Sequence, residues 1–375
     1  MIRLEPGLRC GAMTVPVSKS HAHRVLLAEF LAGRLVSLES ADEDCDDICA
    51  TKRCLRALAA ARSSGAAVLD CGESGTTRRL LGPVVAACGV TPIWEMKGRL
   101  ASRPQIAYPT LASGVHELAG DVSSQFVSGL LFALPILDGD SEIRLSSPLA
   151  SRGYVDMTLD VLRAYGIAVE ETATGFRVAG RQRYRAPAAE PCIETDWSGA
   201  AFPLAMRALG NDVRLADACQ AGLTADSRQP DRAVVRLLAD FAKAGDVSVD
   251  VDACPDLFPV LTVVAARRAG RTRFTGIRRL RLKESDRVAA MAGVLARFGV
   301  TTEVSETAFV VRGRLRPLCG GAFCSFADHR VAMSIAVGAT VADAAVEIDD
   351  AACAAKSYPG FFAQFTALAP QTATA

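Results

Sequence analysis

One short stretch in the C-terminal half sets an acid among a dense group of cations. Residues 278–287 read Arg-Arg-Leu-Arg-Leu-Lys-Glu-Ser-Asp-Arg. Arg279, Arg281 and Lys283 alternate with two leucines, which predicts a strand that carries its cations on one face. Such a row of cations suits a phosphate group, and Glu284 held among them suits general acid–base chemistry. A solvated charged face and a nucleic-acid-binding patch are the alternatives for this segment alone.

Six polar motifs along the chain each lead directly into an apolar segment. The motifs begin at Ser18, Ser74, Ser123, Asp196, Asp256 and Asp328. The segments are apolar on nearly every side, which predicts buried helices, and Ser and Asp are residues that cap helix N-termini. A helix N-terminus offers unpaired N–H groups and a partial positive charge, so several together would form an anion site. An ordinary capping role is the alternative for any single motif, but six in register favour the anion site.

A second pattern lies between these segments and outlines a repeating unit. Residues 162–170 and 295–303 each read as the end of an amphipathic helix, a glycine stop and the start of a strand, with a looser copy at 238–245. Each unit should hold a buried helix, a strand, a surface helix and further strands. This predicts an α/β fold of about six units, three in each of two domains. Prolines fall inside three of the expected buried helices and leave their ends open, at positions 83, 135 and 203.

Composition excludes several classes of protein. Of the 375 residues, 50% are hydrophobic and 22% are charged, which excludes a disordered chain. The net charge of +1 argues against a protein that coats nucleic acid or an anionic membrane. The apolar runs are too short to cross a bilayer, and residues 1–6 have no apolar signal core. We therefore expect a globular protein of the cytoplasm with no nucleic-acid or membrane partner.

The cysteines and histidines give no clear metal or cofactor signal. None of the twelve cysteines forms a Cys-x-x-Cys pair, and the one cluster, Cys45, Cys49 and Cys54, has no histidine close in sequence. Small reduced core residues are the favoured interpretation over a metal or disulfide role. His21 and His23 straddle the first helix start, where a structural role is the more common one. Phosphate-loop and dinucleotide-binding motifs are missing, so no nucleotide cofactor is expected.

The segments above, in this order, resemble the family of 5-enolpyruvylshikimate-3-phosphate synthases, which are enolpyruvyl transferases. The resemblance covers nearly the whole chain and rests on nine motifs taken together. They are Ser18-Lys19-Ser20-x-x-x-Arg24, Gly72-Glu-Ser-Gly75-Thr-Thr-Arg-Arg79, Arg99-x-x-x-Arg103-Pro104, Ser123-Ser124-Gln125-Phe126, Ser151-Arg-Gly-Tyr154, Pro255-Asp256, Lys283-Glu284-Ser-Asp-Arg287, Asp328-His329-Arg330-x-Ala-Met333 and Ala355-Lys356-Ser-Tyr-Pro359.

The resemblance implies a reaction, an architecture and a set of binding residues. Family members transfer the enolpyruvyl group of phosphoenolpyruvate to the 5-hydroxyl of 3-phosphoshikimate through a tetrahedral intermediate, as monomers without metal or cofactor, and glyphosate inhibits them. Two domains of three βαβαββ repeats are implied, residues 1–17 plus 197–375 and residues 18–196, with buried helices that point their N-termini at the cleft between the domains. Phosphoenolpyruvate would bind Lys19, Gly75, Arg103, Gln125, Arg287, Arg330 and Lys356. 3-Phosphoshikimate would bind Lys19, Ser20, Arg24, Ser123, Ser124, Gln125, Ser151, Asp256 and Lys283.

The chemistry of this reaction suggests catalytic roles. A proton must leave the 5-hydroxyl and another must reach the methylene carbon of phosphoenolpyruvate. Asp256 and Glu284 are the carboxyl candidates, with Asp256 expected at the hydroxyl and Glu284 at the methylene. Lys19 and Lys356 are the cationic candidates.

The sequence departs from the family's pattern at three points, and it leaves two rival functions open. The segment between Pro104 and Ser123 is shorter than in familiar members, so the third repeat is expected to lack strand material. Glu73 and Arg279 stand where many members carry Asn, which puts a substrate role for Arg279 in doubt. The rivals are an enolpyruvyl transferase acting on UDP-N-acetylglucosamine and a non-catalytic protein that binds phosphorylated metabolites. The first shares fold and donor but lacks the first and seventh motifs.

Overall fold

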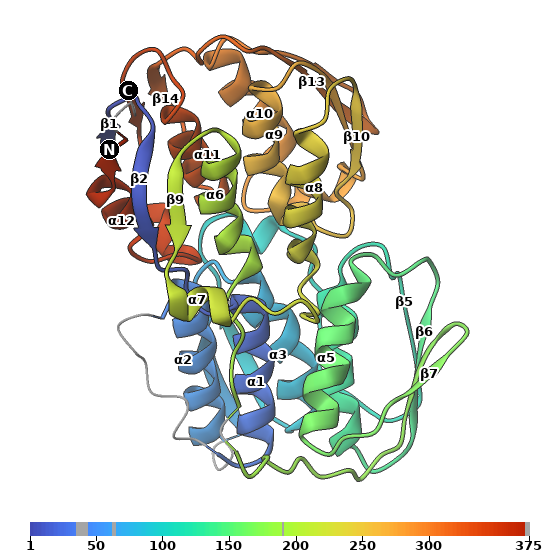
Figure 1. Cartoon of the computed structure of the whole chain (residues 1–375). Coiled ribbons are helices and arrows are strands. Elements are labelled where there is room, and N and C mark those ends of the chain that lie inside the picture. The colour runs from blue at the N-terminus through green and yellow to red at the C-terminus, as the bar shows by residue number, and fades with distance from the viewer. Residues whose placement is uncertain (35–43, 62–64, 190, 372–375) are drawn as a thin grey trace. The chain divides into compact units, whose positions relative to one another are not determined.

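The computed structural model describes residues 1–34, 44–61, 65–189 and 191–371. The chain forms two compact units, which we name by their continuity. The discontinuous unit comprises Met1–Ser18 and Glu194–Ala375, and the inserted unit comprises Lys19–Ile193. The sequence analysis placed these boundaries at 17/18 and 196/197. In Figure 1 the discontinuous unit holds the dark blue N-terminal strands and the yellow to red part of the chain.

The discontinuous unit contains three sheets and three buried helices. Its helices are α6 (Trp197–Ala208), α7 (Asp217–Ala221), α8 (Val234–Phe241), α9 (Phe258–Ala266), α10 (Arg287–Arg297), α11 (His329–Ala339) and α12 (Phe361–Ala367). Its strands are β1 (Ile2–Leu4), β2 (Arg9–Met13), β9 (Asp212–Leu215), β10 (Val247–Asp250), β11 (Gly270–Thr275), β12 (Thr301–Val304), β13 (Ala308–Gly313), β14 (Gly321–Phe323), β15 (Val346–Ile348) and β16 (Ala369–Pro370). Short 3₁₀ helices are η4 (Pro230–Ala233), η5 (Pro255–Leu257), η6 (Arg278–Leu282) and η7 (Ala352–Lys356). The strand orders are β1-β15-β14, β10-β11-β13-β12 and β16-β2-β9, and α6, α9 and α11 pack against one another in the core.

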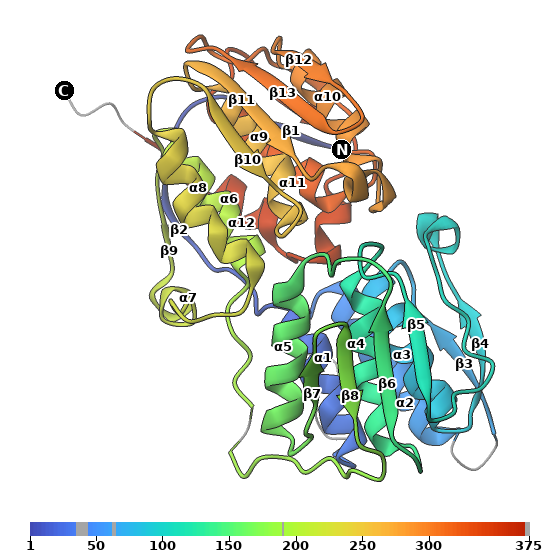
Figure 2. The same ribbon diagram turned by 90° about the vertical axis from the view of Figure 1, so that its right-hand side faces the viewer.

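The inserted unit has a core of its own. Its helices are α1 (Lys19–Leu31), α2 (Asp46–Ala60), α3 (Gly75–Ala87), α4 (Ser124–Ala133) and α5 (Arg152–Ala164), with 3₁₀ helices η2 (Gly98–Ser102) and η3 (Leu134–Ile136). Its strands are β3 (Ala66–Asp70), β4 (Thr91–Glu95), β5 (Val115–Leu118), β6 (Ser141–Leu145), β7 (Glu170–Thr172) and β8 (Gly175–Val178). The described strands form two sheets, β3-β4 and β5-β6-β8-β7. Figure 2 shows the second of these sheets face on, with α4 and α5 beside it.

The two four-stranded sheets show the same repeat. The order β5-α4-β6-α5-β7-β8 matches β10-α9-β11-α10-β12-β13, and both sheets pair one parallel and two antiparallel neighbours. Gly166 follows α5 with φ +76° and Gly299 follows α10 with φ +73°, the left-handed conformation of a helix stop. The expected βαβαββ repeat and its glycine stops are confirmed in these two copies.

All six expected buried helices form, and the expected cap hydrogen bond is described for four of them. Ser74, Ser123, Asp196 and Asp328 each accept a hydrogen bond from a backbone N–H of the first turn. Asp256 is different: it lies inside η5, and α9 has no side-chain cap. The prediction that Asp256 caps a helix is wrong, because neighbouring cations bind its carboxylate instead.

Two other expectations need correction. Residues 278–282 form the 3₁₀ helix η6 and not a strand, because β11 ends at Thr275 and is followed by Gly276, where φ is +71° and a Cβ would lie 2.3 Å from Asp250 Oδ1. Leu280 is buried while Leu282 is exposed, so the two leucines do not share a face. The short segment between Pro104 and Ser123 was expected to remove strands from the third repeat, but that repeat is complete. The reduced sheet belongs to another repeat: β3 and β4, which precede and follow α3 in the sequence, form a sheet with only two described strands.

Candidate active site

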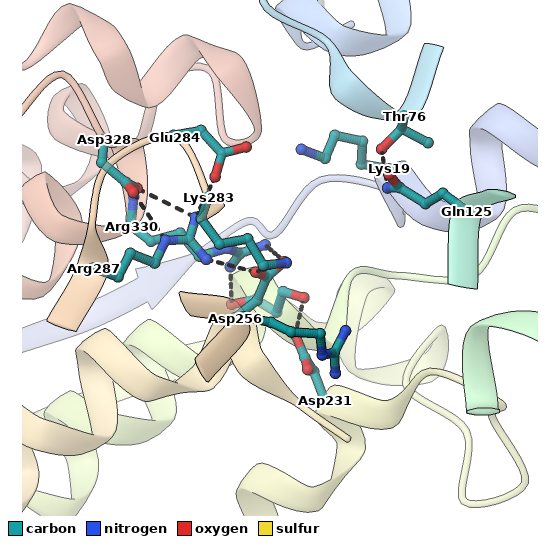
Figure 3. A network of polar contacts seen from close by, with 12 residues as sticks. Lys19, Thr76, Gln125, Asp231, Asp256, Lys283, Glu284, Arg287, Asp328 and Arg330 are labelled. Carbon is teal, nitrogen blue, oxygen red and sulfur yellow. Dashed lines mark hydrogen bonds and ion pairs between the residues drawn. The ribbon is translucent and has the colours of Figure 1, made fainter. Parts of the chain in front are cut away.

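A buried guanidinium organises the charged cluster of the discontinuous unit. Arg287 is 1% exposed and binds three carboxylates: Nη1 lies 2.6 Å from Asp256 Oδ1, Nη2 lies 2.9 Å from Glu284 Oε2, and Nε lies 2.9 Å from Asp328 Oδ2. Figure 3 shows this guanidinium among its three partners. Arg330 adds a fourth link, with Nη2 3.3 Å from Asp256 Oδ2. Two of the three carboxylates are thus those expected to move protons.

Most residues of the cluster lie at helix starts, and Glu284 lies in the short segment between η6 and α10. Asp256 lies in η5 just before α9, Arg287 is the first residue of α10, and Arg330 is in the first turn of α11. Asp328 binds two partners. Its Oδ1 caps α11 by accepting a hydrogen bond from the backbone N–H of Arg330, and its Oδ2 accepts a hydrogen bond from Arg287 Nε. Helix starts therefore bring together residues that lie far apart in the sequence, with net partial positive charge at that position.

Opposing effects set the protonation state of Asp256. Burial by itself would raise its pKa, but Lys283, Arg330 and Arg287 hold the pKa of this carboxyl well below its usual value. Lys283 Nζ lies 3.5 Å from Asp256 Oδ1, and burial lowers the pKa of this lysine despite that neighbour. Asp256 is therefore an ionised carboxylate in contact with three cations.

A fourth carboxyl, Asp231 in η4, was not expected from the sequence. It is 1% exposed, accepts a very short hydrogen bond from the Ser198 hydroxyl, and its Oδ1 has no hydrogen-bond partner among the described residues. Burial first, and then the charge of Asp256, raise the pKa of Asp231 to about 7. Arg330 also donates to the Ser198 backbone oxygen, so Asp231 borders the cluster. No local pattern around Pro230-Asp231 signals this, since the contact depends on tertiary packing.

In the inserted unit, Lys19 begins α1 and is held by an acid that the sequence analysis missed. Lys19 Nζ lies 2.7 Å from Asp47 Oδ2, and Asp47 is in the first turn of α2. The acidic pair Asp46-Asp47 at a helix start was the available signal. Ser20 follows on α1, and its backbone oxygen accepts a 2.6 Å hydrogen bond from Arg24 Nη1.

Arg24 lies deeper than its expected role suggested. Its guanidinium is 1% exposed and also donates to Thr158 Oγ1 at 2.8 Å and to the Tyr154 oxygen at 2.9 Å. Burial lowers the pKa of Arg24 to about 10. These hydrogen bonds join α1 to α5, so Arg24 anchors the helix that carries Lys19 and Ser20.

The start of α3 brings Gly75 and Arg103 together. A Cβ on Gly75 would lie 3.1 Å from Arg103 Nη1, so the missing side chain makes room for this guanidinium. Gln125 is adjacent: its Nε2 donates to Thr76 Oγ1 at 2.8 Å, and its Oε1 accepts from Arg79 Nη1 at 2.8 Å. Three of the residues expected to hold phosphoenolpyruvate thus lie around one helix N-terminus.

The serines expected to hold 3-phosphoshikimate sit at two other helix starts. Ser123 caps α4 and Ser124 is its first residue. Ser151 precedes α5 in a left-handed conformation with φ +50°, which is uncommon outside glycine, and it is buried. Residues other than glycine that are kept in a left-handed backbone conformation cluster at functional sites.

The remaining residues are placed as follows. Lys356 ends η7 and is 6% exposed. Arg279 pairs with Asp252, Nη2 to Oδ1 at 3.0 Å, so its charge is engaged outside the cluster around Arg287. Glu73 packs on Gly98, where a Cβ would collide with its carboxylate. Among the described residues, no group of His, Cys, Asp and Glu is arranged to hold a metal ion, and no helix is long and apolar enough to cross a membrane.

Comparison with known proteins assigns the chain to a family. Residues 95–365 match the family model described as EPSP synthase (3-phosphoshikimate 1-carboxyvinyltransferase). The chain is 34% identical to the 3-phosphoshikimate 1-carboxyvinyltransferase of Clostridium kluyveri, over 98% of this chain and 97% of that protein, and 31% identical to that of Clostridium acetobutylicum over the same shares.

Solved structures share the fold at lower identity. EPSP synthase from Acinetobacter baumannii superposes with a TM-score of 0.72 at 20% identity, covering 97% of both chains. The enolpyruvyl transferase NikO from Streptomyces tendae gives 0.65 at 15% identity, covering 98% of this chain and 97% of that one. The family model and the relatives cover most of the chain, and the helix-start clusters agree with them. The chain therefore belongs to the EPSP synthase (3-phosphoshikimate 1-carboxyvinyltransferase) family.

Proposed function

We propose that this protein transfers the enolpyruvyl group of phosphoenolpyruvate to the 5-hydroxyl of 3-phosphoshikimate and releases phosphate. The observation that carries the proposal is the pair Asp256 and Glu284, which bind the two Nη atoms of the buried Arg287 guanidinium. A protein that only binds anions needs the cations but has no use for two acids among them. The family name, 3-phosphoshikimate 1-carboxyvinyltransferase, gives the acceptor and the transferred group, and the cluster offers two carboxyls as candidates for the acid and the base.

The addition step forms one C–O bond, converts the C=C double bond to a single bond and moves two protons. The hydroxyl oxygen attacks C2 of phosphoenolpyruvate while Asp256 accepts the hydroxyl proton and Glu284 delivers a proton to the methylene carbon, which becomes a methyl group. In the elimination both transfers are reversed: Glu284 takes a proton from the methyl group, the C2–O bond to phosphate breaks, and Asp256 returns its proton to the departing phosphate, so the product keeps the enolpyruvyl group. Lys19 and Lys356 are the cationic candidates for the departing phosphate.

The low pKa of Asp256 fits this scheme once substrates bind. In the described structure three cations hold this carboxyl ionised, so it is ready to accept a proton but only weakly basic. Phosphate and carboxylate groups of the substrates would share Arg287, Arg330 and Lys283 with it, which raises the pKa of Asp256 toward that of a useful base. Substrate binding would therefore activate the base that the reaction needs.

Phosphate release tests the proposal directly. Protein mixed with phosphoenolpyruvate and 3-phosphoshikimate should release phosphate, whereas phosphoenolpyruvate with UDP-N-acetylglucosamine should not. The opposite pattern would establish the rival transferase, and no release with either acceptor would leave a binding protein.

We also propose that the enzyme acts as a monomer in the cytoplasm, which light scattering and cell fractionation would check.

Two neutral variants assign the acid and the base. Asp256→Asn and Glu284→Gln keep the side-chain shapes, so substrate affinity should stay within about tenfold while turnover falls about 100-fold or more. Glu303→Gln, an exposed partner of Arg312 on β12, is the matched control and should keep full turnover. Loss of calorimetric binding with turnover per bound complex intact would make these acids binding residues only.

A further inference from the structure

A continuous chain of buried polar side chains crosses the core of the inserted unit. His23 Nδ1 lies 2.6 Å from Thr51 Oγ1, Thr51 Oγ1 lies 2.6 Å from Thr77 Oγ1, and Thr77 Oγ1 lies 2.7 Å from Ser74 Oγ. These residues come from α1, α2, α3 and the cap of α3, and each is at most 2% exposed. Polar groups buried at this depth depend on other protein groups for their hydrogen bonds, so the geometry of the chain is restrictive.

The direction of the chain follows from its histidine. Burial above all lowers the pKa of His23 to about 3, so the imidazole is neutral and carries a single N–H. Its Nε2 has no hydrogen-bond partner among the described residues. A buried N–H without an acceptor is rarer and more costly than an unused acceptor, so the hydrogen belongs on Nδ1. His23 then donates to Thr51, Thr51 to Thr77, and Thr77 to Ser74.

Both ends of this chain adjoin residues assigned to phosphoenolpyruvate. His23 lies one helical turn after Lys19 on α1, and Ser74 directly precedes Gly75. In the middle, Thr77 Oγ1 also lies 3.4 Å from the backbone oxygen of Asp47, whose carboxylate binds Lys19. The helices that carry Lys19, Asp47 and Gly75 are therefore fastened to one another at their N-terminal ends.

We propose that the His23–Thr51–Thr77–Ser74 chain is a positioning network that sets the spacing between Lys19 and the start of α3 for phosphoenolpyruvate. The proposal rests on the proposed function. Apolar packing between helices tolerates small slides, but a hydroxyl that must both accept and donate tolerates only a narrow range of spacings. Ser123, Ser124 and Ser151, which are assigned to 3-phosphoshikimate, take no part in these hydrogen bonds, whereas Lys19 and Ser20 on α1 are also assigned to it. The network should therefore act more strongly on phosphoenolpyruvate than on 3-phosphoshikimate.

Thr51→Val tests the network at its centre, because valine has the shape of threonine without the hydroxyl. A displacement of a few tenths of an ångström at Lys19 and Gly75 should raise KM for phosphoenolpyruvate about five- to tenfold, with a smaller rise of up to about threefold in KM for 3-phosphoshikimate, which shares Lys19. Thr51→Ser keeps the hydroxyl and should restore the wild-type KM. Thr262→Val is the matched control: its hydroxyl is equally buried on α9 but bonds only the Pro259 oxygen of its own turn, so both KM values should stay unchanged.

A double-mutant cycle asks whether Thr51 acts through Ser74. Ser74→Ala removes the end of the chain, so Thr51→Val should add no further rise in KM for phosphoenolpyruvate on that background. A full additional rise would show that Thr51 acts by another route and would overturn the proposed connection.

The protonation of His23 tests the network without any measurement of turnover. The protein has only four histidines, so long-range ¹H–¹⁵N spectra can assign the imidazole of His23. We expect a neutral ring with its hydrogen on Nδ1 between pH 5 and pH 8, and a hydrogen on Nε2 would overturn the direction of the chain. A lower Tm for Thr51→Val with both KM values unchanged, or an equal rise in both, would reduce the network to a structural role. Absence of phosphate release by the wild-type protein would instead refute the proposed function.

Discussion

Asp256 and Asp231 show how two carboxyls in one unit are driven to opposite protonation states. Cations hold the pKa of Asp256 well below its ordinary value, whereas burial raises the pKa of Asp231 to about 7. An aspartate in an unfolded chain titrates at about 3.9. Between about pH 4 and pH 7 the folded protein therefore binds a proton at Asp231 that the unfolded chain does not, so this residue makes stability fall as the pH rises, with no further change above about pH 7.

Asp231→Asn should remove this dependence, because the amide resembles the protonated acid and still accepts from Ser198. We expect the Tm of the variant relative to wild type to increase from pH 4 to pH 8 by roughly 4 °C or more, and then to level off. Differential scanning calorimetry at several pH values measures it, with the exposed Asp217→Asn as control. A Tm difference that is constant with pH would mean that Asp231 titrates normally.

Gly75 illustrates a glycine kept for a close approach. The Cβ of alanine would lie 3.1 Å from Arg103 Nη1, so the guanidinium would have to move by a few tenths of an ångström. Gly75→Ala should therefore raise KM for phosphoenolpyruvate about tenfold and weaken inhibition by glyphosate, with KM for 3-phosphoshikimate unchanged. Steady-state kinetics with each substrate varied will check this. Equal losses for both substrates would indicate a folding defect instead.

At the scale of elements, α3 and α4 approach so closely that only glycine fits between them. A Cβ on Gly129 of α4 would lie 2.6 Å from the backbone oxygen of Arg79. Gly129→Ala should push the two helices apart and destabilise the protein by about 1–3 kcal/mol, the range for overpacking. Gly293→Ala on α10 is the control: its Cβ would meet only Phe326 at 3.7 Å, so it should be neutral or stabilising by up to about 1 kcal/mol. Urea unfolding of both variants gives the comparison, and equal effects would refute the packing argument.

The elements that could be predicted are those with a local cause. Buried helices follow from apolar segments behind Ser or Asp, and the stops at Gly166 and Gly299 follow from their left-handed backbone. The strand expected over 278–283 failed because alternation of charge and leucine also fits a 3₁₀ turn, and Gly276 had already ended β11. For the candidate site, the sequence motifs pointed to the residues proposed for binding and catalysis, but no sequence signal pointed to Asp231 or to the His23–Thr51–Thr77–Ser74 chain. Those depend on which helices meet, and no spacing within one segment encodes that.

At the scale of the whole molecule, the chain leaves and re-enters the discontinuous unit at one place. Val17 and Thr195 form an antiparallel bridge, and the Ser18 N–H donates to the Glu194 oxygen at 2.7 Å. Each unit also has its own hydrophobic core. The inserted unit therefore resembles a domain placed within a hairpin.

Replacing residues 19–193 by Asn-Gly should leave the discontinuous unit folded, because a two-residue turn suits antiparallel neighbours. The residues proposed for catalysis and binding are divided between the units, so this variant should have no turnover. Circular dichroism and a cooperative thermal transition would show folding, with phosphate release as the activity assay. A variant that unfolds would show that the discontinuous unit depends on the inserted one.

The pairing of the N-terminal strands also dictates an order of events on the ribosome. β1 and β2 are made first, but β2 pairs with β9 and β16, and β1 pairs with β15, which ends at residue 348. At about 5–20 residues per second, these strands wait on the order of tens of seconds for their partners, while the inserted unit is already complete by residue 193. We therefore expect the nascent chain to carry a folded middle and unpaired ends. β2 can pair with β9 soon after the inserted unit is made, so during a pause between β13 and β15 it is β1 that still lacks its partner and is open to proteases and chaperones.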